Sequence, residues 1–463
     1  MSEAKITRRD YALILGGSMA GLFIATVLSK YFQRVTIIER DPVHDEPESR
    51  KGQPHTRHLH GLLETTYRFL EHHLPGVIQE LVDGGALTGD FGESVRWYHF
   101  DGYKIEAPIG IQGMTVSRPF LEWHVRRYVT NLPNVTLLDA TAAEELVTDA
   151  SRSRVTGIKV TRRAENAVSE TIEADLVIDA SGRGSATPKW LTELGYEAPQ
   201  EEMVNVRFGY ATRLYKRDPN MENAKVLMIA PTPPKGKSGA FMFPIEGDRW
   251  ILTAGGWFGG HPPADEAGFM EFIRNLPTPD IYNIVCHAEP LSDIILYKYP
   301  YSRRLRYDRL SRFPEGYLVV GDAVASFNPI YGQGMSSAAL QIETLDQMLK
   351  QGDISGKWRT FFRRTAKIID MPWLIAGGED YRYPETEGKR PLGTNFINWY
   401  ITFVHRATQR DPVVYNQFLK VMHLLANPYS LAYPRIMWRV VRASISNWFR
   451  PKTTNVKARL AHS

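Results

Sequence analysis

The amino-acid sequence predicts an α/β fold with a buried parallel sheet, an inserted and mostly antiparallel sheet, and a helical C-terminal region. Three observations lead to this prediction. Apolar, β-branched runs at 11–15 and 35–39 flank a helical pattern, as in a βαβ unit buried on both faces. Residues 196–300 hold short strand-like runs between Gly- and Pro-rich turns. Beyond Gly352 the pattern is helical, with interruptions expected at Pro372, Pro384, Pro391, Pro412, Pro428 and Pro434.

The composition is that of an ordinary globular protein of two or three domains. The chain has 463 residues, 43% hydrophobic and 23% charged, which excludes disorder, a collagen-like repeat or a coiled coil as the main architecture. The formal net charge is +5, but the last 29 residues hold seven basic and no acidic side chains, so the remainder carries −2. Nucleic-acid binding by the body is therefore not expected. The seven basic residues are Arg435, Arg439, Arg442, Arg450, Lys452, Lys457 and Arg459.

Cys286 is the single cysteine, which excludes an internal disulfide and any Cys-based zinc or iron–sulfur site. It predicts a reducing, cytoplasmic location. The N-terminal apolar run ends at Gly16-Gly17 rather than at a cleavage site, so we interpret it as a strand and not as a signal peptide. No stretch approaches the ~18 apolar residues that cross a bilayer, so no transmembrane segment is expected.

The first half of the chain supplies most of the predicted α/β elements. A strand at Tyr11–Leu15 leads through a glycine-rich turn into a helix that continues to Ser29, and a second strand follows at Val35–Glu39. Residues 40–60, rich in Pro, charge and His, are expected to form a long loop. Helices are expected at Gly61–Asp83 and at Arg118–Thr130, the latter with Pro119 in its first turn. Further strands are predicted at Val135–Leu138, Val155–Val160 and Asp175–Asp179.

Residues 196–300 are expected to form an inserted, mostly antiparallel sheet. Its predicted strands are Val204–Thr212, Val226–Ile229, Gly239–Pro244 and Trp250–Ala254. A buried strand at Gly316–Asp322 and a helix from about Gly334 return to the α/β pattern. We therefore predict a discontinuous nucleotide-binding domain at 1–80, 114–195 and 296–350. The sheet domain is expected at 81–113 and 196–295, and the helical region with its basic tail at 351–463.

The first motif is Gly16-x-Ser18-x-x-Gly21, with Glu39 at the end of the second strand. A strand that turns sharply into a helix needs small residues where the backbone meets a pyrophosphate and where helix packs on strand. Ser18 adds a hydroxyl that can donate to phosphate, and Glu39 can accept from ribose hydroxyls. A packing turn alone is the alternative. The motif favours a Rossmann-like dinucleotide site whose candidate residues are Gly16, Gly17, Ser18, Met19, Ala20, Gly21, Glu39 and Arg40.

The second motif is Gly321-Asp322, followed by a proline- and glycine-rich segment that leads into a helix. An Asp at a strand end can bind ribityl hydroxyls. Glycines let the backbone approach a planar ring, and a helix N-terminus offers free N–H groups and a positive dipole end to an anionic flavin. A capped helix after a turn is the alternative. The candidate residues are Gly321, Asp322, Pro329, Gly332, Gln333, Gly334 and Met335.

A third segment, Asp175–Ser185, ends a strand in a turn that contains Gly182. In this order the three segments resemble the FAD-dependent monooxygenases with the p-hydroxybenzoate hydroxylase fold, over about residues 10–350. The resemblance implies that the first motif binds the ADP half of FAD and that the Gly-Asp motif binds the ribityl and flavin half. It also implies that Arg118, at the start of its helix, meets the FAD phosphates.

More specifically, three segments and the helical C-terminus resemble the bacterial branch that contains polyether-type flavin epoxidases. The segments are Arg50-x-Gly52-x-Pro54-x-x-x-His58-x-His60, Asp179–Ser185 with Trp190-Leu191 after it, and Tyr210-x-Thr212-Arg213. In the C-terminus the similar stretches are Asp411-Pro412-Val413, Asn427-Pro428 and Pro434-Arg435. The chain has Ala180-Ser181-Gly182 where related hydroxylases have Ala-Asp-Gly, an Asp tied to the nicotinamide donor. NAD(P)H is therefore expected as electron source either directly or through a separate flavin reductase. The Trp-x-Trp-x-Ile-Pro motif of flavin halogenases is absent, which argues against halogenation.

The resemblance implies a monooxygenase that uses FAD and O2 and transfers one oxygen atom from a C4a-hydroperoxyflavin. The expected substrate is a fairly large, apolar, unsaturated or aromatic small molecule of secondary metabolism, with epoxidation favoured over hydroxylation. Two alternatives remain open at this point. One is a flavin-dependent reductase of isoprenoid-like double bonds without oxygen insertion. The other is a non-catalytic lipid-binding protein on the same fold.

The remaining candidates concern the pocket. Arg50 contacts the flavin by resemblance, or is a cation of a charged loop. His58 and His60 shape the pocket or form a structural pair; no third ligand accompanies them, so no metal site is expected. Aromatic residues of the inserted sheet and of the helical region line the cavity or pack in the core. These aromatic residues are Phe241, Phe243, Trp250, Trp257 and Phe258, then Trp373, Tyr381, Tyr383, Trp399 and Tyr400.

The basic tail has two interpretations. Arg435, Arg439 and Arg442 share one helical face beside aromatic residues, which is compatible with peripheral contact with an anionic membrane. A helix packed on the body with a solvated basic face is the alternative. We expect deletion of the segment after Arg450 to leave the body folded and the cofactor bound.

Overall fold

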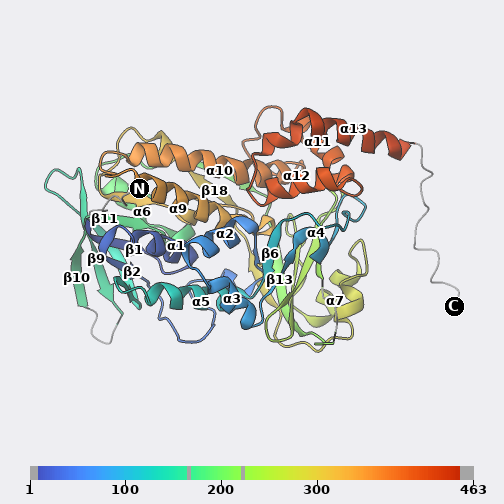
Figure 1. The fold of residues 1–463 in the computed structure, drawn as a ribbon, viewed down its shortest axis with the longest axis horizontal. Coiled ribbons are helices and arrows are strands. Elements are labelled where there is room, and N and C mark those ends of the chain that lie inside the picture. Colours follow the sequence, from blue (N-terminus) through green and yellow to red (C-terminus); the bar gives the residue numbers. More distant parts are fainter. Residues whose placement is uncertain (1–8, 164–167, 221–224, 449–463) are drawn as a thin grey trace, which may run out of the picture.

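A computed structural model describes residues 9–163, 168–220 and 225–448 of the chain. It shows the predicted α/β fold, with an inserted sheet and a helical C-terminal region. In Figure 1 the parallel sheet and its helices occupy one end, the inserted sheet with α7 occupies the other, and α11, α12 and α13 lie along one side. The division into the three predicted regions stays a proposal.

A five-stranded parallel sheet forms the centre of the first part. Its strand order is β19-β11-β1-β2-β7, and every neighbouring pair runs parallel. The order brings together segments more than 300 residues apart, because β19 pairs with β11 beside β1. The strands are β1 (Arg9–Leu15), β2 (Phe32–Ile38), β7 (Val135–Leu138), β11 (Leu176–Asp179) and β19 (Tyr317–Val319).

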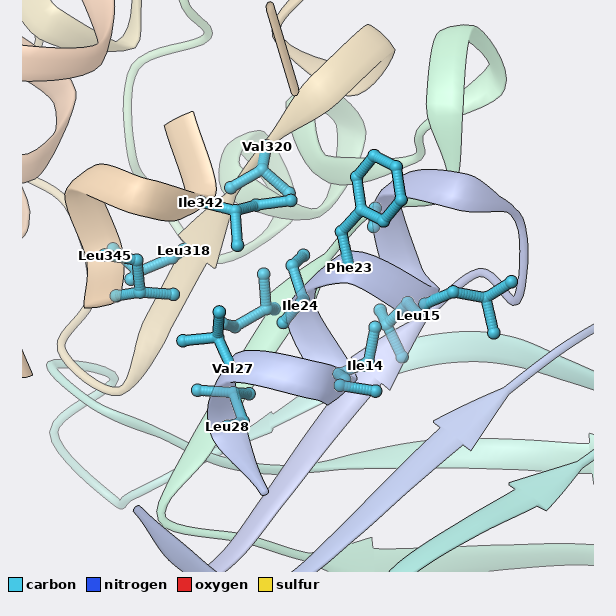
Figure 2. Packing of buried hydrophobic residues seen from close by; sticks show 14 of the residues in the cluster. Ile14, Leu15, Phe23, Ile24, Val27, Leu28, Leu318, Val320, Ile342 and Leu345 are labelled. Carbon is cyan, nitrogen blue, oxygen red and sulfur yellow. The ribbon is translucent and has the colours of Figure 1, made fainter. Parts of the chain in front are cut away.

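Helix α1 (Met19–Leu28) is buried between this sheet and α9 (Gly334–Lys350). Nine of its ten residues are buried, as expected for a helix that is apolar all round. Figure 2 shows Phe23 and Ile24 of α1 among Ile14 of β1, Leu318 of β19 and Ile342 of α9. This packing fixes the N-terminal ends of α1 and α9 relative to the strand ends.

The inserted sheet has six strands in the order β17-β13-β16-β15-β14-β5. All pairs are antiparallel except β14 with β5. One face packs Trp250 against Phe269 of α7 (Glu266–Arg274), and the other turns Phe241 and Phe243 toward the C-terminal helices. The strands are β5 (Val95–Tyr98), β13 (Gly209–Lys216), β14 (Val226–Ile229), β15 (Ser238–Ile245), β16 (Arg249–Gly256) and β17 (Ile295–Lys298).

Three smaller sheets complete the β-structure of the described residues. Their strand orders are β10-β9-β8, β20-β18-β12-β21 and β3-β6-β4. Their strands are β3 (Gly61–Leu62), β4 (Leu87–Asp90), β6 (Gln112–Thr115), β8 (Thr141–Thr148), β9 (Val155–Arg162), β10 (Val168–Glu173), β12 (Glu201–Asn205), β18 (Ser302–Leu305), β20 (Ala325–Ser326) and β21 (Glu387–Gly388).

Helices cover the sheets and form the C-terminal region. None of the helices in the described part of the chain has the length and apolarity required to cross a membrane. Besides α1, α7 and α9 they are α2 (Glu64–His73), α3 (Val77–Asp83), α4 (Phe91–Ser94), α5 (Arg118–Thr130), α6 (Thr187–Glu193), α8 (Tyr282–Val285), α10 (Trp358–Asp380), α11 (Thr394–Ala407), α12 (Pro412–Met422) and α13 (Pro434–Trp448).

Several predicted elements differ in the structure. Pro372 lies inside α10 and does not interrupt it, whereas Pro412 and Pro434 begin helices. The predicted helix 61–83 is two helices, because Gly76 adopts φ +94° between them. The predicted strand 204–212 is divided between β12 and β13, since Arg207 turns the chain with φ +44°. Four basic residues of the tail lie outside the described residues: Arg450, Lys452, Lys457 and Arg459.

Candidate functional site

The turn between β1 and α1 requires its glycines. Gly16 has φ +105°, and a Cβ there would lie 2.6 Å from the carbonyl oxygen of Ala180. A Cβ on Gly21 would lie 1.8 Å from the carbonyl oxygen of Gly16. Only glycine therefore fits at these two positions, where helix and strand come close together. Gly16 also lines the cavity described below.

Glu39 directly follows β2, and its side chain binds the backbone of this turn. Its Oε2 accepts a hydrogen bond from the Gly17 N–H at 2.8 Å, and its Oε1 accepts from the Asp41 N–H at 2.9 Å. Arg50 pairs with Oε2 at 3.0 Å. The carboxylate is thus held in place, and Glu39 also lines the cavity, where its lone pairs can accept from ribose hydroxyls.

A buried carboxylate that the sequence analysis missed lies behind the turn. Glu122, on α5, pairs with Arg50 and with Arg118 and accepts from the Ser18 hydroxyl at 2.9 Å. Burial alone would raise the pKa of Glu122, but Arg118 and Arg50 hold it below its ordinary value. The spacing of Arg118 and Glu122 by four residues on one helix was the sequence signal for this pair. Ser18, expected to donate to phosphate, donates to Glu122 here.

Two helices present their N-terminal ends to the same cavity. Ser18 precedes α1 and Gln333 precedes α9, and neither side chain caps its own helix. The free N–H groups and positive dipole ends of both helices are therefore directed at cavity-lining residues. Arg118 joins the two ends, because Nη2 lies 3.0 Å from Ser18 Oγ and Nη1 lies 3.2 Å from Met335 Sδ. Anionic parts of a ligand in this cavity would therefore find two helix ends and one guanidinium.

The Gly-Asp motif lies beside α9. Asp322 is accessible to the cavity, and its carboxylate accepts no hydrogen bond from the described residues. Burial within the surrounding protein raises the pKa of Asp322, while Arg118 and Arg183 oppose that rise. Gly332 adopts φ +67° and leaves its Cβ position open. Gln333 is buried, donates to the Met422 carbonyl at 3.0 Å and leaves Oε1 without a partner.

The third segment is held by Asp179 at the end of β11. This buried carboxylate accepts from the Ser181 N–H at 2.8 Å and from the hydroxyls of Ser185 and Thr187, both at 2.5 Å. Gly182 has φ +80° in the resulting turn. Ser181, which stands where related hydroxylases have Asp, is thus part of the turn's own hydrogen bonding and lines the cavity.

One cavity of about 2150 Å³ connects the three segments. It exceeds the ~300–1,000 Å³ of ordinary small-molecule pockets, so it has room for a dinucleotide and a substrate together. Four of the predicted cofactor-site residues do not line it: Gly17, Gly21, Arg50 and Gly321. The predicted cofactor-site residues that line it are Gly16, Ser18, Met19, Ala20, Glu39, Arg40, Arg118, Gly182, Asp322, Pro329, Gly332, Gln333, Gly334 and Met335.

The other part of the cavity is largely aromatic. Phe241, Phe243 and Trp257 line it from the inserted sheet. From the helical region Trp373, Tyr381, Tyr383 and Tyr400 line it as well. Trp250 belongs instead to the core under α7, and Trp399 is 58% exposed on the outer surface. Phe258 packs edge-on against Tyr383 at 5.4 Å between ring centroids.

His58 and His60 both line the cavity. Nδ1 of His58 lies 2.8 Å from the Thr212 hydroxyl, and Nδ1 of His60 lies 2.9 Å from the His58 carbonyl oxygen. Because a carbonyl only accepts, Nδ1 of His60 carries the proton. Burial, with the charge of Arg118, lowers the pKa of His60 well below its ordinary value, and burial with His55 lowers that of His58 to about 4. Both rings are neutral at pH 7.

Asp380, at the end of α10, is a second buried carboxylate that the sequence analysis missed. Its Oδ1 accepts from the Tyr331 hydroxyl at 2.9 Å and from the Asn328 amide at 3.3 Å. Burial raises the pKa of Asp380 to about 7 despite these donors. The contact ties the helical region to the Pro329–Gly332 segment. Asp380 ends a continuous helical pattern and carried no local motif that would have indicated this contact.

Among the residues that the structure describes, one group of side chains has the spacing of a metal site, and it lies outside the cavity. His73, Glu343 and Asp346 bring ligand atoms within 4.8 Å of one another. Lys30 lies 2.8 Å from His73 Nδ1, and Lys350 pairs with Asp346 at 2.5 Å. These ammonium groups already balance the carboxylates, and we assign no metal here.

The chain has a fold of the p-hydroxybenzoate hydroxylase type. The chain is similar to the flavin-dependent brominase Bmp2 (TM-score 0.66, 14% identity, covering 95% of this chain and 99% of that one). It is also similar to a flavoprotein/dehydrogenase from Cytophaga hutchinsonii (TM-score 0.67, 16% identity, 94% and 99% covered). A third similar structure is PqsL, a probable FAD-dependent monooxygenase from Pseudomonas aeruginosa (TM-score 0.59, 16% identity, 81% and 98% covered).

Sequence similarity extends over nearly the whole chain. Protein Rv3254 of Mycobacterium tuberculosis is 30% identical over 461 residues, which cover 96% of this chain and 95% of that protein. The chain belongs to the family of Protein Rv3254. No protein-family model matches the chain.

Proposed function

We propose that this protein is an FAD-dependent monooxygenase that inserts one oxygen atom from O2 into a fairly large, apolar, unsaturated or aromatic molecule. The observation that carries the proposal is the pair of uncapped helix N-termini that Arg118 joins within a single cavity. That cavity continues directly into an aromatic chamber. An anion-binding half and an apolar half, side by side, suit a dinucleotide flavin and an apolar substrate.

The residues present fit FAD. The α1 N-terminus and Arg118 would hold the pyrophosphate, and Glu39 would accept from the adenosine ribose. Asp322, whose carboxylate has no hydrogen-bond donor among the described residues, would accept from the ribityl chain. The α9 N-terminus would face the electron-rich edge of the ring, and Gly332 leaves room for the ring beside its backbone. Gln333 offers an unpartnered Oε1 in the same segment.

When bound, a reduced flavin supplies the two electrons that activate O2 for transfer of one oxygen atom. The protein positions the substrate and excludes water from the reaction site. Phe241, Phe243 and Trp257 surround the substrate space with apolar surface, which excludes water and holds an apolar molecule against the flavin half. The positive end of α9 would favour the negative charge of a reduced flavin.

The side chains around the chamber favour epoxidation of an alkene over hydroxylation of a phenol. Phenol hydroxylation benefits from a base that takes the phenol proton, whereas epoxidation needs only positioning. Burial lowers the pKa of His55 and of His58 to about 4, so neither is an effective base near neutral pH. Nε2 of His60 can accept a hydrogen bond from a substrate hydroxyl, yet its lowered pKa keeps it from holding a proton.

The electrons come from NAD(P)H, either directly or through a separate flavin reductase. Position 181, which carries an Asp in related hydroxylases, is a serine here and offers no carboxylate, and its hydroxyl donates to Asp179 within the same turn. This supports delivery of electrons by a partner reductase. The exposed thiol of Cys286 is compatible with a reducing, cytoplasmic location.

Oxygen labelling tests the proposal. The FAD-loaded protein is mixed anaerobically with a reduced-flavin source and candidate alkenes, then exposed to ¹⁸O₂; we expect one labelled oxygen atom in an epoxide product. A parallel reaction with bromide tests for halogenation, because Bmp2 has a similar fold. The Arg118→Met variant, prepared in the same way, serves as a control with weakened flavin binding.

The rival functions predict different outcomes. A reductase of isoprenoid-like double bonds gives a saturated product without oxygen, and a non-catalytic lipid-binding protein carries no flavin spectrum. Flavin oxidation without label in any product would count against oxygenation.

A further inference from the structure

Exposed apolar side chains are concentrated in the helical region. Of the fourteen large apolar residues that are exposed in the described part of the chain, ten lie between 392 and 445. Monomeric proteins rarely expose such a cluster unless it binds something. We call these ten residues the apolar patch: Leu392, Phe396, Ile397, Trp399, Tyr429, Tyr433, Met437, Trp438, Val441 and Ile445.

Two helices supply most of the patch. Phe396 and Trp399 follow each other at helical spacing on α11, and their rings stack at 5.7 Å between centroids. On α13, Trp438, Val441 and Ile445 form one exposed stripe, although Ile436 and Val440 bury a different apolar face against the body. The two helices pack against each other and lie side by side in Figure 1. The patch is therefore built on packed helices rather than on a loop.

The part of the sequence that carries the patch is strongly basic. Residues 389–463 contain twelve basic side chains and a single acidic one, Asp411, for a net charge of +11, whereas the rest of the chain carries −6. Asp411 pairs with Arg439 at 2.9 Å. Arg435 and Arg442 are exposed on the same stripe of α13 as Trp438, and Arg390 is exposed just before α11. The surface thus combines aromatic side chains with uncompensated positive charge.

Part of the patch borders the cavity. Phe396, Ile397, Tyr429 and Met437 are exposed to solvent and also line the cavity that contains the aromatic chamber. These four residues therefore connect the exposed surface with the cavity that contains the aromatic chamber.

We propose that the apolar patch docks on a membrane surface that contains anionic lipid, and that the apolar substrate enters the cavity from the lipid. Trp and Tyr side chains favour the lipid–water interface, and Arg and Lys side chains favour anionic headgroups. The density of positive charge selects an anionic bilayer rather than a second copy of this chain, whose patch would carry the same charge. The entry of substrate rests on the proposed function; the docking itself does not.

Vesicle co-sedimentation of the full-length, FAD-loaded protein tests the docking. We expect binding to vesicles of phosphatidylglycerol with phosphatidylcholine, weak binding to phosphatidylcholine alone, and release by high salt. Trp438→Ser and Trp399→Ser are each expected to lower binding to the anionic vesicles about tenfold. Leu291→Ser and Val168→Ser change exposed apolar residues elsewhere and serve as controls that keep full binding.

Binding of Arg442→Gln to the anionic vesicles tests the contribution of positive charge in the patch. The control is Lys189→Gln, at an exposed site on α6. Deletion of residues 449–463 separates the patch from the tail. Loss of binding on that deletion, with no effect of the two Trp variants, would overturn the proposal. So would an absence of binding to anionic vesicles, or a dimer in sedimentation that the Trp variants dissociate. Flavin content and labelled-oxygen transfer to a detergent-dissolved alkene report on the proposed function separately.

Discussion

Arg118 donates a hydrogen bond to the sulfur of Met335, which lies 217 positions further along the chain. Through Nη2 the same guanidinium reaches Ser18. One side chain of α5 therefore spans the N-terminal ends of α1 and α9, which come from opposite ends of the nucleotide-binding part. Glu122, one turn further along α5, holds the guanidinium from behind.

Replacing Arg118 by Met should weaken FAD binding about ten- to a hundredfold, because hydrogen bonds to a charged group contribute about 1.5–3 kcal/mol. Equilibrium dialysis of the apoprotein against FAD measures the change. Arg127→Met, on the same helix but with its side chain half exposed, is the matched control and should bind FAD as the wild type does. Equal affinity of the wild type and the Arg118 variant would remove Arg118 from the proposed site.

Gly16→Ala should lower the free energy of unfolding by about 1–3 kcal/mol, because φ +105° and the Ala180 carbonyl at 2.6 Å leave no place for a Cβ. Chemical denaturation measures the loss. Gly184→Ala is the control, since its Cβ position is open and its φ is not positive. If both variants are equally stable, the turn adapts more readily than its geometry indicates.

Glu122→Gln should destabilise the protein by about 3–5 kcal/mol at pH 7, because it leaves Arg50 and Arg118 buried without their shared anion. The lowered pKa of Glu122 sets the pH dependence. Its stabilisation is present above the ordinary pKa of 4.5 and is lost as the pH falls through the lower folded value. The difference in free energy of unfolding between wild type and variant should therefore shrink below about pH 4.5, and denaturant titrations at several pH values would show it.

Asp380→Asn has the opposite pH dependence. Burial raises the pKa of Asp380 from 3.8 to about 7, so the stability linked to its neutral form is present below pH 3.8 and is lost as the pH rises to about 7. The amide has no charge to bury. The difference in melting temperature, variant minus wild type, should therefore be larger at pH 8 than at pH 5, as differential scanning calorimetry would measure. A pH-independent difference would mean that Asp380 is ionised at both values.

Local patterns in the sequence were enough to predict the main strands and the glycine turns, whereas the resemblance to a known family was needed to join the turns in one site. Each of these elements depends on neighbours in the chain: Gly16 and Gly21 lie in one turn, and β7 and α5 begin and end at the predicted residues. Contacts across the fold were not accessible in this way. Asp380 meets Tyr331 from a distant helix, and Arg207 divides a continuous apolar run because its backbone turns left-handed. Pro372 remains within α10 because tertiary packing overrides a local preference.

The order of strands in the parallel sheet has a consequence for the nascent chain. Strand β19 pairs with β11, and the second helix end of the cofactor site begins at Gly334. During synthesis the ribosome must therefore produce more than 330 residues before the two ends of the site can meet. Until then β11 presents an unpaired edge and α1 has no α9 to cover it, so the emerging chain exposes apolar surface that a chaperone can bind.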